Sequence, residues 1–404
     1  MRTCQRLLFG IVLLSLACAG QTNPSSHSPA PQVTYNPNDP LNAAAFDHFY
    51  NLDYPRAVES FQQIVQRHPD DPFAVNHLLT AVLMRELYRM GAMNSGEYAN
   101  DSFIGNSHHP PDSKAKEQIE KLVERAEALE EARLKDNPKD TNALYARGVT
   151  RADFSIYVAL VQRAWFSALR NAVGARHDHE RVLELDPKYT DAKLVVGTHL
   201  YVIGSLSWSV KMAVAMVGLS GSKDKGIQYL YDVANSNGEA NVDAKVVLSL
   251  FLRREQRYEE ALRIMRGLGA AYPRNLLFAL EEGNLLRAER RYPEAEAVYK
   301  KVFDAGREGH YPGLHFELAA LSLGDLLRSE KNYRDAATAY LQVETVKDAD
   351  PEYRQRADLS AGQVYDNMQS RDQAVKQYQA AIAVDDKTSQ ADAARKCLQN
   401  PCKD

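Results

Sequence analysis

A repeat of 34 to 41 residues in the C-terminal half of the chain limits most strongly what it can fold into. Each copy carries an alanine within a short polar segment, and these are Ala261, Ala295, Ala336 and Ala374. A bulky residue follows four positions later, and these are Met265, Tyr299, Tyr340 and Tyr378. A small residue precedes the alanine by twelve positions, and these are Ser249, Gly283, Gly324 and Gly362. Repeats of this period indicate stacked helical hairpins, because a single hairpin cannot bury its apolar face alone. The chain is therefore predicted to be all-α.

These small, alanine and bulky positions resemble the tetratricopeptide repeat (TPR) family, with Pro273 and Pro351 near the ends of second helices. The match is close over residues 242–385. Upstream matches are Ala57, Phe61 and Pro69, then Ala175, Pro187 and Gly197, and a degenerate second helix with Gly226, Leu230 and Val233. The resemblance implies a TPR-like α-solenoid, a superhelix of about seven to eight helical hairpins. Such chains usually bind a partner rather than catalyse a reaction.

The N-terminus has the layout of a secretory signal. Arg2 and Arg6 precede an apolar run at residues 7–17, and small residues follow. Ala17-Cys18-Ala19 fits release of a soluble protein, whereas residues 15–18 resemble a bacterial lipobox that would leave Cys18 lipidated. We expect an exported protein of the bacterial periplasm, either free or tethered to the membrane by that anchor.

The expected organisation has five parts. Residues 1–19 form the signal peptide and residues 20–40 a flexible Pro/Ser-rich leader. Residues 41–241 hold irregular repeats with insertions, residues 242–398 hold regular repeats and a capping helix, and residues 399–404 form a tail. Cys397 and Cys402, near the C-terminus, are either joined by a disulfide or two free thiols.

Two insertions distinguish the central hairpins. Gly148 lies 27 residues before Ala175, and Gly197 lies 29 before Gly226, against 12 in the regular repeats. We therefore expect two lengthened central hairpins. Candidates for an apolar site lie in these insertions, namely Tyr157, Trp165, Phe166, Trp208, Met212 and Met216. They form either ordinary core or an apolar pocket or patch.

A second candidate surface follows from helix register. The resemblance places the first helix of each hairpin along a concave groove, with Arg253, Arg287 and Arg328 in one column. Asn284 and Asp325 lie one turn earlier. Guanidinium groups there are suited to grip carboxylates of an acidic partner segment. Alternatively, these arginines are solvated and favoured by the helix dipole. Asp366 breaks the column in the last repeat.

The charge balance and the missing motifs argue against nucleic-acid binding and against several enzyme classes. With 49 basic and 53 acidic residues the net charge is −4, and no basic stripe indicates nucleic-acid binding. Metalloprotease, P-loop, esterase and dinucleotide fingerprints are missing from the sequence, so no enzyme, cofactor or metal is expected. We expect an exported, non-catalytic scaffold that binds a protein or peptide in the cell envelope. The alternative is a periplasmic binding protein for a small apolar or lipid-like ligand, from a faint resemblance in layout to TPR-type lipoproteins associated with TRAP transporters.

Overall fold

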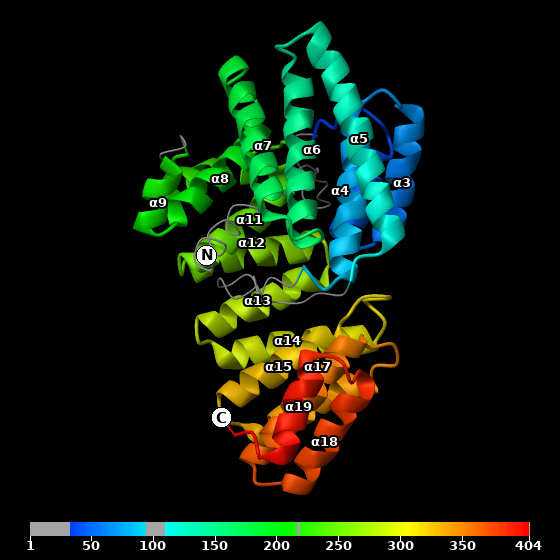
Figure 1. The fold of residues 1–404 in the computed structure, drawn as a ribbon, viewed down its shortest axis with the longest axis vertical. Coiled ribbons are helices and arrows are strands. Elements are labelled where there is room, and N and C mark those ends of the chain that lie inside the picture. Colours follow the sequence, from blue (N-terminus) through cyan, green and yellow to red (C-terminus); the bar gives the residue numbers. More distant parts are fainter. Residues whose placement is uncertain (1–32, 94–109, 216–218, 404) are drawn as a thin grey trace, which may run out of the picture. The chain divides into compact units, whose positions relative to one another are not determined.

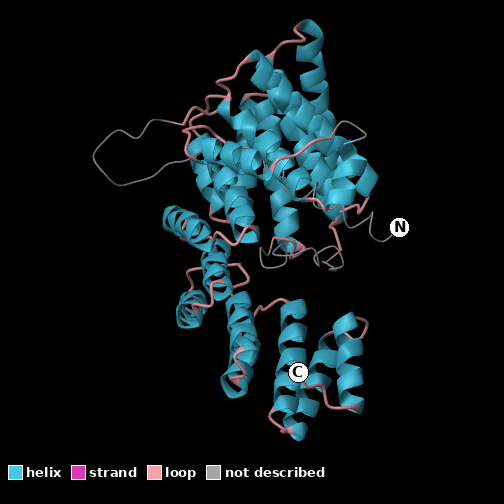
Figure 2. Cartoon of the chain, turned by 90° about the vertical axis from the view of Figure 1, so that its left-hand side faces the viewer, coloured by secondary structure: helices cyan, strands magenta, loops and turns pink. Residues whose placement is uncertain are grey.

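The fold is helical throughout the part that the structure describes. This computed structural model describes residues 33–93, 110–215 and 219–403, and no strand occurs within those ranges (Figures 1 and 2). The chain divides into two compact units, Met1–Tyr272 and Pro273–Asp404. None of the described helices is long and apolar enough to cross a membrane.

Unit 1 (Met1–Tyr272) begins with three hairpin-forming helices and ends with the first regular repeat. Its helices are α2 (Asn42–Tyr50), α3 (Tyr54–Arg67), α4 (Pro72–Arg89), α5 (Ser113–Asp136), α6 (Thr141–Leu160), α7 (Trp165–Leu185), η3 (Thr190–Ala192), α8 (Lys193–Ser205), α9 (Trp208–Ala215), α10 (Lys223–Ala234), α11 (Asn241–Arg254) and α12 (Tyr258–Ala271). Those of unit 2 (Pro273–Asp404) are α13 (Leu276–Ala288), α14 (Tyr292–Arg307), α15 (Glu317–Ser329), α16 (Tyr333–Gln342), η4 (Val343–Thr345), α17 (Pro351–Asn367), α18 (Arg371–Val384) and α19 (Ser389–Gln399).

The repeat positions do what their spacing predicts. The four repeat alanines, Ala261, Ala295, Ala336 and Ala374, are fully buried. In unit 2 each small residue faces the tyrosine of its own repeat. A β-carbon on Gly283 would lie 2.4 Å from the ring of Tyr299, and one on Gly324 would lie 2.5 Å from the ring of Tyr340. Glycine is therefore required where the first helix passes over the tyrosine ring, and the predicted all-α hairpin architecture is confirmed.

The turn inside each of the four regular repeats is also the same. A residue with positive φ lies five positions before the repeat alanine, and these are Gln256, Arg290, Lys331 and Gln369. Leu52 occupies the same position before Ala57 in the first hairpin. None of these residues is glycine, although the left-handed conformation costs other residues about 1–2 kcal/mol. The packing of the two helices therefore holds this turn in place.

The first insertion lengthens a hairpin, as expected. Helix α6 has 20 residues and α7 has 21. Its turn contains Arg163 with positive φ, five positions before the buried Ala168. The contact between the small and the bulky residue of the repeat lies further along the pair. A β-carbon on Gly148 would lie 2.3 Å from the ring of His179, four positions after the buried Ala175, which is the same contact as in the regular repeats. Ala175 therefore holds the position of the repeat alanine, as its spacing predicted, and the extra residues are divided between α6 and α7.

The second central hairpin is lengthened in another way. Helices α8 and α10 have 13 and 12 residues, so neither is long. The extra residues form a separate short helix, α9, which Figure 1 shows at the edge of unit 1 beyond α8.

Part of the expected flexible leader is packed on unit 1. Tyr35 stacks on Phe46 with ring centroids 5.3 Å apart. Asp39 is buried and pairs with Arg67 at 3.0 Å and His68 at 2.9 Å. Residues 33–40 therefore belong to the folded unit, because they supply an aromatic ring and a carboxylate that the helices bind.

Candidate functional site

A row of polar side chains follows the first helices of the repeats in unit 2. Asn284 lies on α13 and Asp325 on α15, each one turn before an arginine, and all are half-buried. The hydroxyl of Tyr299 donates to Oδ1 of Asn284 at 2.8 Å, and that of Tyr340 donates to Oδ1 of Asp325 at 2.7 Å. Asn284 and Asp325 therefore fix the core tyrosines of their repeats, a role that the sequence did not indicate.

The arginines of this row link neighbouring repeats. Arg287 Nη2 donates to the backbone carbonyl of Asp325 at 3.3 Å. Arg328 Nη1 donates to Oε1 of Gln363 on α17 at 2.7 Å. The Asp325 carboxylate also pairs with Arg356. These four half-buried side chains alternate between an arginine and an Asn or Asp along α13 and α15. We call them the arginine row (Asn284, Arg287, Asp325, Arg328).

Arg253, the remaining member of the predicted column, lies in the last turn of α11 in unit 1. The predicted column therefore divides between the two units. The arginine row lies entirely within unit 2.

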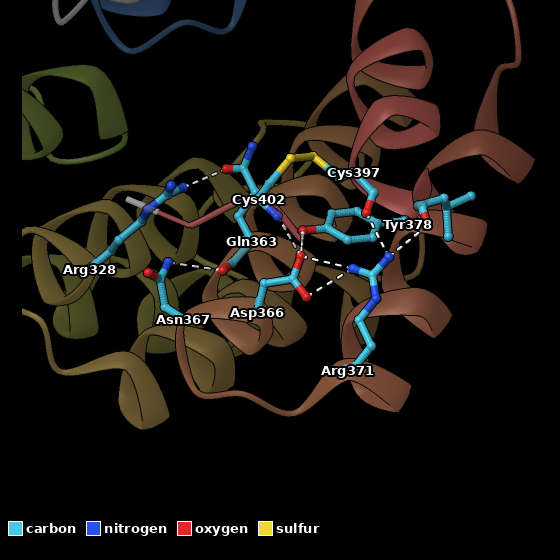
Figure 3. Close-up of a disulfide and its surroundings, with 9 residues drawn as sticks. Arg328, Gln363, Asp366, Asn367, Arg371, Tyr378, Cys397 and Cys402 are labelled. Carbon is cyan, nitrogen blue, oxygen red and sulfur yellow. Dashed lines mark hydrogen bonds and ion pairs between the residues drawn. A yellow bond between two sulfur atoms is a disulfide. The ribbon is translucent and has the colours of Figure 1, made fainter. Parts of the chain in front are cut away.

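A different arrangement closes the array at the C-terminus (Figure 3). Asp366 is buried at the position where earlier repeats have an arginine. Its carboxylate accepts hydrogen bonds from the hydroxyl of Tyr378 and from the backbone N–H of Cys402, both at 2.8 Å. Arg371 pairs with the same carboxylate at 2.9 Å. Cys397 and Cys402 form a disulfide, so the first of the two alternatives left open by the sequence is the one present. Asp366 breaks the column because it holds the capping segment.

A family model matches part of unit 2. The tetratricopeptide repeat model matches residues 280–353, which run from within α13 to the start of α17. This part of the chain consists of tetratricopeptide repeats. TPR arrays are generally protein-interaction scaffolds without catalytic activity, and the glycine–tyrosine contacts described above are the packing that this repeat requires.

The solved structures that match this chain have low sequence identity and low TM-scores. The Pseudomonas aeruginosa PilF structure is 17% identical, with 64% of this chain and 99% of that chain covered and a TM-score of 0.37. A Parabacteroides merdae tetratricopeptide repeat protein is 15% identical, with 79% and 97% covered and a TM-score of 0.33. The Cut9–Hcn1 structure is 12% identical, with 90% and 56% covered and a TM-score of 0.46. No curated protein matches. None of these similarities bears on function.

The aromatic candidates of the central hairpins lie in different environments. Tyr157 is fully buried, and its hydroxyl donates to Glu120 at 3.0 Å. Trp165 is half-buried, whereas Phe166 is 81% exposed at the start of α7. Trp208 and Met212 on α9 are 78% and 53% exposed. The core interpretation therefore holds for Tyr157 and is wrong for Phe166, Trp208 and Met212, which lie on the surface. Met216 and Cys18 lie outside the described residues.

Sequence reasoning missed a buried polar cluster in unit 1. His77 on α4 bonds Glu239, Thr80 donates to Asp153 at 2.6 Å, and the Tyr50 hydroxyl donates to Asp243 at 3.2 Å. Burial raises the pKa of Asp153 to about 8, so this carboxyl group is protonated below about pH 8. Burial also raises the pKa of Asp243 well above its ordinary value.

No local signal could have revealed this cluster. Its residues lie up to 193 positions apart in the sequence, and they meet only when α2, α4, α6 and α11 pack. In the part of the chain that the structure covers, no group of three or more histidine, cysteine or carboxylate side chains is arranged to hold a metal ion.

Proposed function

We propose that this protein is an exported, non-catalytic TPR scaffold that binds an acidic segment of a protein or peptide partner in the cell envelope. The observation that carries the proposal is the arginine row on α13 and α15. Its guanidinium groups are only half-buried, and Arg287 donates to a backbone carbonyl while Arg328 donates to an amide oxygen. A partner carboxylate offers a charge-assisted bond to each guanidinium.

The partner is identified by chemical crosslinking in the intact envelope, followed by purification and mass spectrometry. Its binding is then measured with Arg287→Glu and Arg328→Glu together. We expect at least about tenfold weaker binding and a salt dependence in the parent protein, since the partner's charges are complementary. The matched control reverses the exposed Lys301 and Arg307 on α14, outside the row. If both double variants bind the partner equally well, the two arginines only connect neighbouring repeats and do not bind the partner.

Export is tested separately. If Cys18 is lipidated, Cys18→Ser moves the protein from the membrane fraction to the soluble fraction, because stable anchoring needs more than one acyl chain. A parent protein that is already soluble in the periplasm would retain the export proposal and exclude the anchor. A parent protein that stays in the cytoplasm would exclude both.

A further inference from the structure

Helix α9 exposes two large apolar side chains on one face. Trp208 is 78% exposed and Met212 is 53% exposed. Residues four positions apart lie on the same face of a helix. Elsewhere in the described ranges only Phe166 on α7 is a large apolar residue of comparable exposure. Contiguous apolar surface on a soluble protein marks a site of interaction.

The chain holds this helix away from the unit by closing the two ends of the excursion together. A β-carbon on Gly221 would lie 2.4 Å from the backbone nitrogen of Gly204, and one on Gly204 would lie 2.6 Å from the backbone nitrogen of Lys223. The backbone therefore leaves and re-enters the α8–α10 pair at one point. Two glycines allow that contact, so α9 is an appended element rather than a part of the helical stack (Figure 1).

The charge of this region differs from that of the whole chain. Residues 192–223 contain no aspartate or glutamate, although the chain has 53 acidic residues among 404. Of the three lysines in this span, Lys193 and Lys223 pair with Asp232 and Glu255 at 2.6 Å, and Lys211 lies on α9. Lys211 lies three positions after Trp208 and directly before Met212, so the apolar face has a basic edge. No carboxylate among the described residues pairs with Lys211. The surface therefore complements one that is apolar and negatively charged.

We propose that α9 is a membrane-surface contact that seats Trp208 and Met212 in the headgroup region of an anionic bilayer. Tryptophan favours that region because its ring is apolar and its N–H is polar. Lys211 extends its stem along the apolar face and places its ammonium group among lipid phosphates. A helix of eight residues cannot span the bilayer and lies in its plane. An acidic protein has the same charge, but two side chains projecting from a single short helix match a fluid lipid surface better than a shaped protein pocket.

The contact is measured with phosphatidylethanolamine vesicles containing phosphatidylglycerol, against vesicles of phosphatidylcholine alone. The protein begins at residue 21, which keeps every described residue and omits the apolar run of residues 7–17. The chain has two tryptophans, so Trp165→Phe leaves Trp208 as the only indole. We expect its emission to shift to the blue with the anionic vesicles, to be quenched by brominated lipid, and to recover in high salt.

Two substitutions and one control decide the assignment. Trp208→Ser should weaken co-sedimentation with anionic vesicles about tenfold, because it removes the aromatic side chain that the bilayer would bury. Lys211→Gln should weaken it about fivefold, because it removes one charge. Phe166→Ser is the matched control, since it removes an equally exposed aromatic side chain from α7. All three variants should keep the thermal stability of the parent. Unchanged Trp208 emission with anionic vesicles, or an equal loss from Phe166→Ser, would overturn the proposal. So would a response to an acidic protein in the absence of any response to vesicles.

Discussion

The contact between helices α8 and α10 gives a stability prediction whose sign can be worked out from the structure. A β-carbon on Gly226 would lie 2.6 Å from the carbonyl oxygen of Gly197 and 2.6 Å from the backbone nitrogen of Tyr201. Both contacting atoms belong to the backbone of α8, so no side-chain rotation relieves the overlap. Gly226→Ala therefore forces the two helices apart.

The expected magnitude is the difference between two effects. Alanine is favoured over glycine inside a helix by about 1 kcal/mol. Overpacking a tight contact costs about 1–3 kcal/mol, and the upper end applies where backbone meets backbone. Gly226→Ala should therefore lower the free energy of unfolding by about 2 kcal/mol. Gly267→Ala on α12, in the same unit, is the matched control, because a β-carbon there meets nothing within 4 Å. It should raise the free energy of unfolding by about 1 kcal/mol.

Urea denaturation, followed by circular dichroism and by the fluorescence of the two tryptophans of unit 1, measures both variants. The same substitution should move the midpoint in opposite directions. The reasoning would be refuted by a Gly226→Ala variant as stable as the parent, or by two variants that shift the midpoint in the same direction.

Two further predictions concern a strained turn and a buried acid. Lys331 has a φ of 62°, so Lys331→Gly should be more stable than Lys331→Val by more than about 1 kcal/mol in thermal or urea unfolding, since a β-branched residue tolerates this conformation worst. Burial raises the pKa of Asp153 from 3.8 to about 8, so between these values the folded state holds a proton that the unfolded state releases. The free energy of unfolding should therefore fall as pH rises from about 4 to about 8, and Asp153→Asn should reduce that slope in urea titrations at a series of pH values.

The repeat pattern predicted the packing of the hairpins because that packing is local. Gly324, Ala336 and Tyr340 occur within 17 residues, and each must be small or large for the same two helices to touch. Their spacing therefore predicts both the two helices and the residues that pack between them. The same logic placed the alanine of the first long hairpin, since Ala175 is buried and His179, four positions later, lies against Gly148.

What the sequence could not supply depends on contacts between distant segments. The raised pKa values of Asp153 and Asp243 arise where α2, α4, α6 and α11 converge, and nothing in the flanking residues distinguishes these two from solvated aspartates. Likewise, register placed Asn284 and Asp325 beside the arginines but did not reveal that tyrosine hydroxyls bind them. The extra residues before α10 were detected by spacing, yet only the structure shows that they form a projecting helix.

The bonds made by Arg287 and Arg328 set a minimum length for any partner of the arginine row. In a linear array each repeat touches only its neighbours, so these side chains form part of what keeps one repeat from pivoting on the next. A single carboxylate that binds one guanidinium would break one contact between neighbouring repeats and gain little affinity. A segment long enough to reach both arginines would replace both contacts and bridge three consecutive repeats. On the proposed function, we therefore expect an extended partner segment rather than a short acidic terminus.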